Sequence, residues 1–197
     1  MVKIGVLISG GGTNLQAVID SCENKTINGE VKVVISNKSE AYGLERAKNH
    51  NIKAIYEKDE DKIIEILKEN EIDLVVLAGY LKIISPKLVN EYRNRIINIH
   101  PSLIPAFCGK GYYGEKVHQG VIDYGAKVTG ATVHFVDEGA DTGPIIMQKT
   151  VEVKQDDDAK KLAKRVLEVE HEILTKSIAM FCENKLTVQG RRVYIND

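Results

Sequence analysis

The chain has 197 residues, of which 43% are hydrophobic and 28% are charged, as in an ordinary globular protein. Its 27 Lys and Arg residues nearly balance 28 Asp and Glu residues, so no basic surplus is available for binding nucleic acid. No apolar run approaches the roughly 20 residues of a membrane span, and the first residues lack signal-peptide features. The 3 cysteines are too widely spaced for a disulfide framework or a zinc motif. We therefore expect a cytoplasmic protein with no metal and no membrane or nucleic-acid partner.

The first hundred residues alternate between strand and helix patterns. Apolar runs rich in β-branched residues predict strands at 2–8, 31–36, 52–56, 73–78 and 95–99. Apolar residues at helical spacing predict a helix after the glycine cluster 10–12, and further helices near 41–50, 59–70 and 85–92. Strands that alternate with helices imply right-handed βαβ units and a parallel sheet.

The second half of the chain has a different pattern. Of the 16 glycines, 6 lie between residues 101 and 130, so we expect a long loop there. The stretches 128–136 and 145–153 predict longer strands that pair antiparallel, and an apolar stripe predicts one amphipathic helix over 158–182. The predicted class is therefore α/β, with a Rossmann-like, mostly parallel twisted sheet that is flanked by helices and ends in antiparallel strands.

A glycine-rich loop, 9–14, joins the first predicted strand to the first helix. Thr13 and Gln16 have the spacing of a capping box at the start of that helix. Glycines let a ligand approach the backbone, and the free N–H groups of a helix start attract phosphate. Because Leu15 stands where a dinucleotide fingerprint has its third glycine, and Asn37 where it has an acid, a monophosphate fits better than a dinucleotide. The alternative is a plain tight turn.

Asn98 and His100 lie two residues apart at the end of a predicted strand, so their side chains share one face. Pro101 follows and ends strand pairing. In open α/β sheets, ligands bind beyond the carboxyl ends of the strands. An amide at that position can donate to a developing oxyanion, and an imidazole can donate a charge-assisted hydrogen bond or move a proton. The alternative is a hydrogen-bonded structural histidine.

Asp141 lies in an acidic loop, 137–144, between the two late strands. A carboxylate close to His100 would raise the pKa of the imidazole and keep it protonated near neutral pH. The alternative is a solvated acidic turn. Thr132 and His134 alternate along the preceding strand and could face the same cleft, although a structural role is the simpler interpretation for His134.

Glu170 lies at the margin of the apolar stripe of the last predicted helix. A carboxylate at such a margin is usually solvated, but it could hold an amine if it faced a pocket. His50 and His118 have no comparable surroundings in the sequence, and we expect both to be surface residues.

Four motifs carry a resemblance that covers nearly the whole chain. They lie at 8–16, 77–86, 98–105 and 141–145. Together they resemble the phosphoribosylglycinamide formyltransferases, folate-dependent enzymes of the purine pathway that move a formyl group from 10-formyltetrahydrofolate to the amine of glycinamide ribonucleotide. The resemblance implies one formyltransferase domain, 1–197, with a nucleotide-phosphate-binding half, 1–100, and a folate-binding and catalytic half, 101–197. It also implies small-molecule substrates, no metal, and a monomer or homodimer.

The resemblance further implies roles for individual residues. Asn98, His100 and Asp141 would be the catalytic set, supported by Thr132 and His134. The ribonucleotide would contact Gly12, Thr13, Asn14, Pro101 and Glu170. The folate pocket would be lined by Leu81, Lys82, Ile83, Ile84, Val89, Ile96 and Val136. Asn98 and a protonated His100 would stabilise a tetrahedral oxyanion while Asp141 holds His100 and helps to relay a proton.

Two alternatives remain beside this interpretation. A formyltetrahydrofolate deformylase has a similar domain and uses water as the acceptor, but that family normally carries an additional N-terminal regulatory domain, for which we expect no room before the first strand. A non-catalytic nucleotide-binding or folate-binding protein could use the same scaffold, although a binder has no need for an amide, an imidazole and a carboxylate together. The segment 56–61 lacks the arginine frequent in the resembled family, and Lys82 stands where arginine is common.

Overall fold

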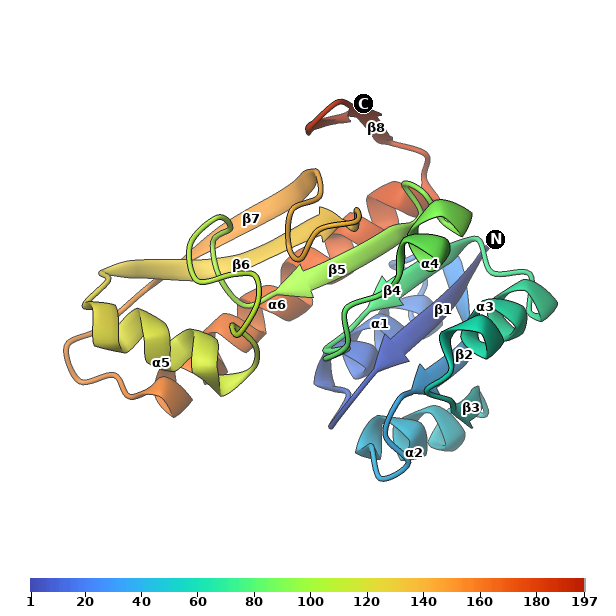
Figure 1. The fold of residues 1–197 in the computed structure, drawn as a ribbon, viewed down its shortest axis with the longest axis horizontal. Helices are drawn as coiled ribbons and strands as arrows, with labels where there is room; N and C mark the ends of the chain where they lie inside the picture. The colour runs from blue at the N-terminus through green and yellow to red at the C-terminus, as the bar shows by residue number, and fades with distance from the viewer. Residues whose placement is uncertain (197) are drawn as a thin grey trace.

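The structure, a computed structural model, describes residues 1–196. A single nine-stranded sheet runs through it in the order β3-β2-β1-β4-β5-β6-β7-β9-β8 (Figure 1). The strands are β1 (Val2–Ile8), β2 (Gly29–Ser36), β3 (Lys53–Tyr56), β4 (Leu74–Leu77), β5 (Ile96–His100), β6 (Val128–Phe135), β7 (Ile145–Glu152), β8 (Leu186–Gln189) and β9 (Arg192–Ile195). The helices are α1 (Thr13–Glu23), α2 (Tyr42–Asn49), α3 (Glu60–Glu69), α4 (Pro86–Glu91), α5 (Glu115–Tyr124) and α6 (Ala159–Cys182).

The sheet changes direction at β5. Strands β3, β2, β1, β4 and β5 are parallel, as the alternating pattern predicts. Strand β6 runs antiparallel to β5 and to β7, which confirms the expected late antiparallel pair. The β5–β6 register sets Asn98 opposite His134 and His100 opposite Thr132. This register brings polar residues of two strands to the same end of the sheet.

Helices cover both faces of the sheet (Figure 1). One apolar cluster packs α1, α2, α5 and α6 against the sheet, and a second packs α3 and α4 against the opposite face. Alternate residues of the parallel strands supply the two clusters: Val76 belongs to the first, whereas Val75 and Leu77 belong to the second. Both sheet faces are therefore buried, as the near-continuous apolar strands predict.

The long helix α6 begins at its predicted start. Asp158 is the N-cap, and its side chain accepts a hydrogen bond from the Lys161 backbone N–H at 2.8 Å. Leu162, Val166 and Ile173 form a fully buried stripe along the helix. Within residues 1–196, no helix combines the length and apolar character that crossing a membrane requires.

The start of α1 differs from the predicted capping box. Gly12, not Thr13, is the N-cap; its φ is 72° and no side chain caps the helix. A Cβ at Gly12 would lie 2.8 Å from the Gly43 Cα atom, so both the left-handed backbone and the close approach require glycine. The Gln16 side chain instead accepts a hydrogen bond from Arg46 at 3.2 Å. The start of the helix is thus shaped by glycine geometry.

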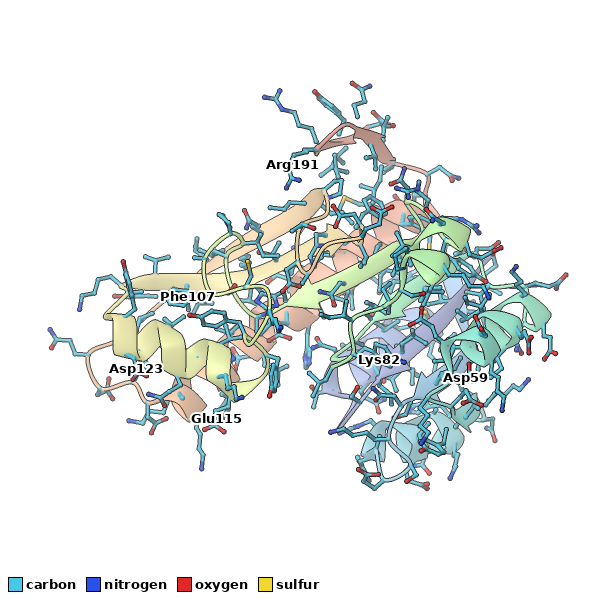
Figure 2. The ribbon with its side chains drawn as sticks, in the orientation of Figure 1. Asp59, Lys82, Phe107, Glu115, Asp123 and Arg191 are labelled. Carbon is cyan, nitrogen blue, oxygen red and sulfur yellow. The ribbon has the colours of Figure 1, made fainter. Side chains whose placement is uncertain are left out.

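Two regions of secondary structure are missing from the sequence prediction. Helix α5 lies inside the stretch for which the sequence predicts a loop. The sequence gives a weak helix signal there, because Gly114 and Gly125 bound only ten residues and Gly120 interrupts the pattern. Figure 2 shows Phe107 beside this helix, where its ring meets Tyr112 and Tyr124 edge-on. The hairpin of β8 and β9 consists of two largely exposed four-residue strands, which give almost no periodic signal.

Candidate active site

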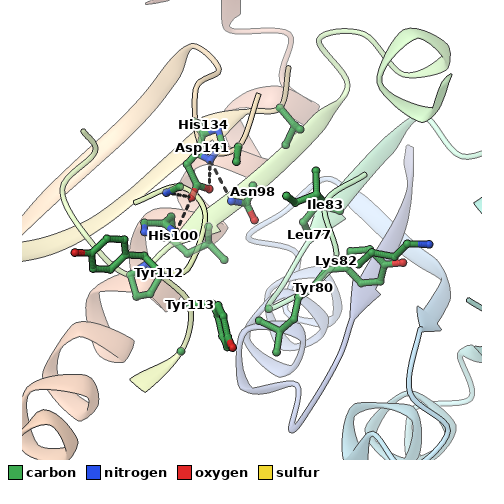
Figure 3. A pocket seen from close by; sticks show the side chains of 18 of the residues that line it. Leu77, Tyr80, Lys82, Ile83, Asn98, His100, Tyr112, Tyr113, His134 and Asp141 are labelled. Carbon is green, nitrogen blue, oxygen red and sulfur yellow. Dashed lines mark hydrogen bonds and ion pairs between the residues drawn. The ribbon is translucent and has the colours of Figure 1, made fainter. Parts of the chain in front are cut away.

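A cavity of about 430 Å³ opens at the carboxyl ends of β4 and β5. The stretches that line it come from far apart in the sequence: Asn14 from α1, residues 79–84, residues 98–101, residues 109–114, residues 136–141, and single residues of α5, β6 and α6. Figure 3 shows Asn98, His100, His134 and Asp141 grouped at one wall, with Tyr80, Lys82 and Ile83 on the other side of the opening. The site therefore lies at the carboxyl end of β5, where the sheet changes from parallel to antiparallel pairing.

Asn98 and His134 are joined across the two strands. The Nδ1 atom of His134 lies 2.8 Å from the Phe135 carbonyl oxygen, to which it donates. In a neutral ring Nε2 is then an acceptor, and the Asn98 Nδ2 atom donates to it at 3.1 Å. An amide nitrogen has a second hydrogen, and Figure 3 shows the Asn98 side chain at the wall of the opening. His134 thereby orients the amide that faces the cavity.

His100 has acceptors at both ring nitrogens. Its Nε2 atom donates to the Phe107 carbonyl oxygen at 3.0 Å, and its Nδ1 atom lies 3.5 Å from the Asp141 carboxylate. A neutral imidazole can satisfy only one of these acceptors, whereas the imidazolium satisfies both. Burial nevertheless lowers the pKa of His100 below its ordinary value, and the Asp141 charge offsets this only in part. The expected net rise is thus wrong, because desolvation outweighs the carboxylate.

Asp141 is held by several groups at once. Its Oδ1 atom lies 3.7 Å from His134 Nε2, and its Oδ2 atom accepts a hydrogen bond from the Gly109 N–H at 2.8 Å. Burial alone would raise the pKa of Asp141, but the two histidines and the Gly109 N–H together bring that pKa below its ordinary value. The carboxyl group is therefore ionised at neutral pH, not the solvated turn that the sequence left open.

Glu170 lies inside the protein, not at a solvated helix edge. Its Oε2 atom accepts a hydrogen bond from Asn14 Nδ2 at 2.8 Å, and both side chains are buried and line the cavity. Burial raises the pKa of Glu170, and the Asn14 hydrogen bond only partly counteracts it. The Asn14 Oδ1 atom has no partner within residues 1–196. The buried Glu170 carboxylate in the cavity lining suits a ligand amine.

The opposite wall is apolar. Leu81 and Ile83 are 53% and 65% exposed, an unusual position for large aliphatic side chains. Lys82, Ile84 and Val136 also line the cavity there. Val89 and Ile96, which were expected beside them, do not; both are fully enclosed in the core between the sheet, α3 and α4. An apolar run of sequence does not distinguish a ligand wall from the core behind it.

Several other expected residues lie outside the cavity lining. Gly12 and Thr13 are at the start of α1 and precede Asn14, which does line the cavity. Thr132 is fully buried and holds the 102–104 turn: its hydroxyl donates to the Ser102 carbonyl oxygen at 2.7 Å and accepts from the Ile104 N–H at 3.1 Å. Pro101 and His134 line the cavity.

The sequence interpretation missed part of the lining. The lining also includes Tyr80, Lys110, Tyr112 and Tyr113. The last three lie in the long glycine-bearing loop, whose sequence does not indicate which side chains face inward. His118 is the clearest correction, because it is buried and lines the cavity where a surface residue was expected. Over residues 1–196, the structure contains no group of three or more His, Cys, Asp and Glu side chains placed to hold a metal ion.

The formyl transferase family model matches residues 2–178, which is most of the chain. The chain belongs to the formyl transferase family. A phosphoribosylglycinamide formyltransferase of Haemophilus influenzae is 39% identical over 205 residues, covering 100% of this chain and 94% of the relative. The chloroplastic phosphoribosylglycinamide formyltransferase of Vigna unguiculata is 43% identical over 193 residues. That match covers 93% of this formyl transferase chain, and the chain spans only 62% of the length of the plant relative.

Solved structures of the family have the same fold. The glycinamide ribonucleotide transformylase 1 of Symbiobacterium toebii superimposes with a TM-score of 0.94 at 43% identity, covering 100% of this chain and 95% of that one. A formyltetrahydrofolate deformylase from Pseudomonas syringae superimposes with a TM-score of 0.90, but at 25% identity and over 66% of its own chain. The formyl transferase sheet, including its antiparallel late strands, is thus common to transferases and a hydrolase.

Proposed function

We propose that this formyl transferase moves the formyl group of 10-formyltetrahydrofolate to the amine of glycinamide ribonucleotide, a step of purine biosynthesis. One observation carries the proposal: the half-buried Asn98 amide and Asp141 carboxylate and the buried His100 imidazole line the same cavity as the buried Glu170 carboxylate. The amide and the imidazole suit an oxyanion, the carboxylate favours the charged form of the imidazole, and Glu170 suits an amine that would attack beside it. Relatives that are 39% and 43% identical to the chain are named phosphoribosylglycinamide formyltransferase and glycinamide ribonucleotide transformylase, which supports the choice of acceptor.

The reaction forms one bond and breaks another. The acceptor nitrogen attacks the formyl carbon, and the carbonyl oxygen becomes an oxyanion in a tetrahedral intermediate. Asn98 donates its free amide hydrogen to this oxygen, and the adjacent His100 imidazolium supplies positive charge. The bond between the formyl carbon and N10 of the folate then breaks, and N10 takes up a proton in exchange for the one lost from the amine.

Asp141 is suited to assist this proton transfer by holding His100 in its protonated form. It contacts both His100 and His134 and stays ionised, so it favours the charged form of His100 as the oxyanion develops. The lowered pKa of His100 in the ligand-free protein rises once a negative oxygen forms beside it. The imidazolium is thus favoured when the transition state needs it.

The two substrates would occupy opposite sides of the cavity. The exposed aliphatic side chains of Leu81 and Ile83 provide a surface for the flat, largely apolar ring system of a folate. The acceptor phosphate would lie at the start of α1, where the N–H groups of Thr13 and Asn14 are not used within the helix. This arrangement would set the acceptor amine between Glu170 and the formyl group.

The direct test measures formyl release from 10-formyltetrahydrofolate by the purified protein, with and without glycinamide ribonucleotide. We expect release that requires the ribonucleotide, with formylated ribonucleotide identified by mass spectrometry. Release without the ribonucleotide would favour the deformylase reaction, and no release from folded protein would favour a binding role.

A further inference from the structure

His118 is a buried polar residue that the proposed mechanism does not use. It lies in the first half of α5, is 4% exposed and lines the cavity. Its Nδ1 atom is enclosed and has no hydrogen-bond partner within residues 1–196. Its neighbour Val117 and the residue one turn later, Val121, are fully buried, so this helix face would accept an apolar side chain at position 118.

An unpaired buried nitrogen is costly. Leaving a buried donor or acceptor unsatisfied costs about 1–3 kcal/mol, and native proteins leave few such atoms. A leucine at this helix position would avoid that cost and would have a higher helix propensity. His118 lines the cavity, and its other ring nitrogen, Nε2, is not enclosed and makes no hydrogen bond within residues 1–196, so a bound ligand is a natural partner for the ring.

The position of α5 indicates which substrate that ligand is. Helix α5 packs against α6, the helix that carries Glu170, and both helices belong to the cluster that also contains α1. The residues expected to contact the donor come instead from 79–84 and from Val136, not from α1, α5 or α6. His118 therefore belongs with Asn14 and Glu170, on the side assigned to the acceptor.

The charge state of His118 narrows the choice of ligand group. Burial, and beyond it the charge of His100, lower the pKa of His118, while Glu115 on the preceding turn opposes this shift. The ring is then neutral at pH 7, with one N–H donor and one nitrogen acceptor. Such a ring suits a hydroxyl or an amide and is a poor partner for a phosphate, which a cation binds better.

We propose that His118 binds the acceptor substrate, through a hydrogen bond between its neutral imidazole and a hydroxyl or amide group of glycinamide ribonucleotide. This assignment rests on the proposed transferase function. His118 is then a residue for acceptor affinity, distinct from the oxyanion-binding pair Asn98 and His100.

His171 offers a matched control on α6. It is also a helical histidine with an enclosed unpaired nitrogen, Nε2, and its pKa is lowered by burial. It does not line the cavity. Replacing either histidine by leucine removes the same chemical group, but only position 118 can contact a substrate.

The experiment compares His118→Leu, His118→Asn and His171→Leu with the wild type in the transfer assay, and records thermal unfolding without ligands. For His118→Leu we expect the acceptor KM to rise about 5- to 10-fold, the equivalent of one lost neutral hydrogen bond, with the donor KM unchanged. The unfolding temperature should not fall. His118→Asn should recover part of the affinity because its amide can replace the ring nitrogen, and His171→Leu should leave both KM values unchanged.

An unchanged acceptor KM in folded His118→Leu, or an equal rise in the donor KM, would overturn the assignment while the wild-type transfer activity kept the proposed function intact. A wild type without ribonucleotide-dependent transfer would instead overturn the proposed function, and the assignment of His118 with it.

Discussion

The two walls of the cavity are built in opposite ways. On one wall, Asn98, His100 and Asp141 are largely buried and engaged with neighbouring side chains and the main chain of 107–109. On the other, the side chains of Leu81 and Ile83 expose aliphatic surface. The first wall is organised before any ligand arrives, as catalysis of a charged intermediate requires. The second wall is exposed to water, and covering its apolar surface with a ligand is favourable because that surface is removed from water.

Among substitutions in the two walls, the largest expected effect on the transfer rate is at the preorganised wall of Asn98, His100 and Asp141. Replacing Asn98 with alanine removes the proposed oxyanion donor, and loss of one such donor typically costs about 2.7–4 kcal/mol, or 100- to 1000-fold in rate. We expect Asn98→Ala to lower kcat by that amount with little change in either KM. The measurement is steady-state transfer, with circular dichroism as the control for folding. Near-normal turnover in a folded variant would remove Asn98 from the mechanism.

A smaller effect is expected at Glu170. Glu170→Gln keeps an oxygen that can accept from Asn14 but removes the charge that would hold the acceptor amine. Loss of a charge-assisted hydrogen bond costs about 1.5–3 kcal/mol, so the acceptor KM should rise about 10- to 150-fold. The raised pKa of Glu170 means that its ionised form destabilises the folded protein at neutral pH. Denaturant unfolding at pH 7 should therefore find the variant more stable than the wild type, and lower stability would contradict the buried carboxylate.

Two isoleucines test whether the apolar wall is distinct from the core. Ile83 is 65% exposed at the cavity, whereas Ile96 is 1% exposed in the core. Ile83→Ala should raise the donor KM about 5-fold, because ~1 kcal/mol of apolar contact is lost, and should leave stability nearly unchanged. Ile96→Val should cost about 0.5–1.5 kcal/mol of stability and leave the donor KM unchanged. Ile195→Ala, at an exposed strand outside the cavity, is the control.

The smallest expected effect is on the pH dependence of stability. Burial lowers the pKa of His100 and of His118 in the folded protein, so the unfolded chain binds more protons just below pH 6.5. The free energy of unfolding should therefore fall as the pH drops from 7.5 through 6.5. Glu170 acts in the opposite direction, so Glu170→Gln is the better background for denaturant titrations. Adding His118→Leu to it should flatten the dependence; an unchanged slope would mean that His118 is not desolvated.

Local patterns in the sequence were sufficient for the parallel sheet and for part of the site. The alternating strands and helices follow from short-range periodicity, and the placement of Asn98 and His100 on one face follows from the two-residue period of a strand. Asp158 begins α6 because a helix start selects an acidic cap. These features depend on neighbours within a few residues, so the sequence alone determined them.

Burial and register, by contrast, were decided only by the tertiary structure. The antiparallel pairing of β6 with β5 sets His134 opposite Asn98, and no local pattern specifies that register. Packing encloses His118 and Glu170, and it separates Ile83 from Ile96, which look alike in sequence. The direction of the His100 pKa shift has the same origin: desolvation comes from every segment packed around the ring, whereas the sequence revealed only a nearby carboxylate.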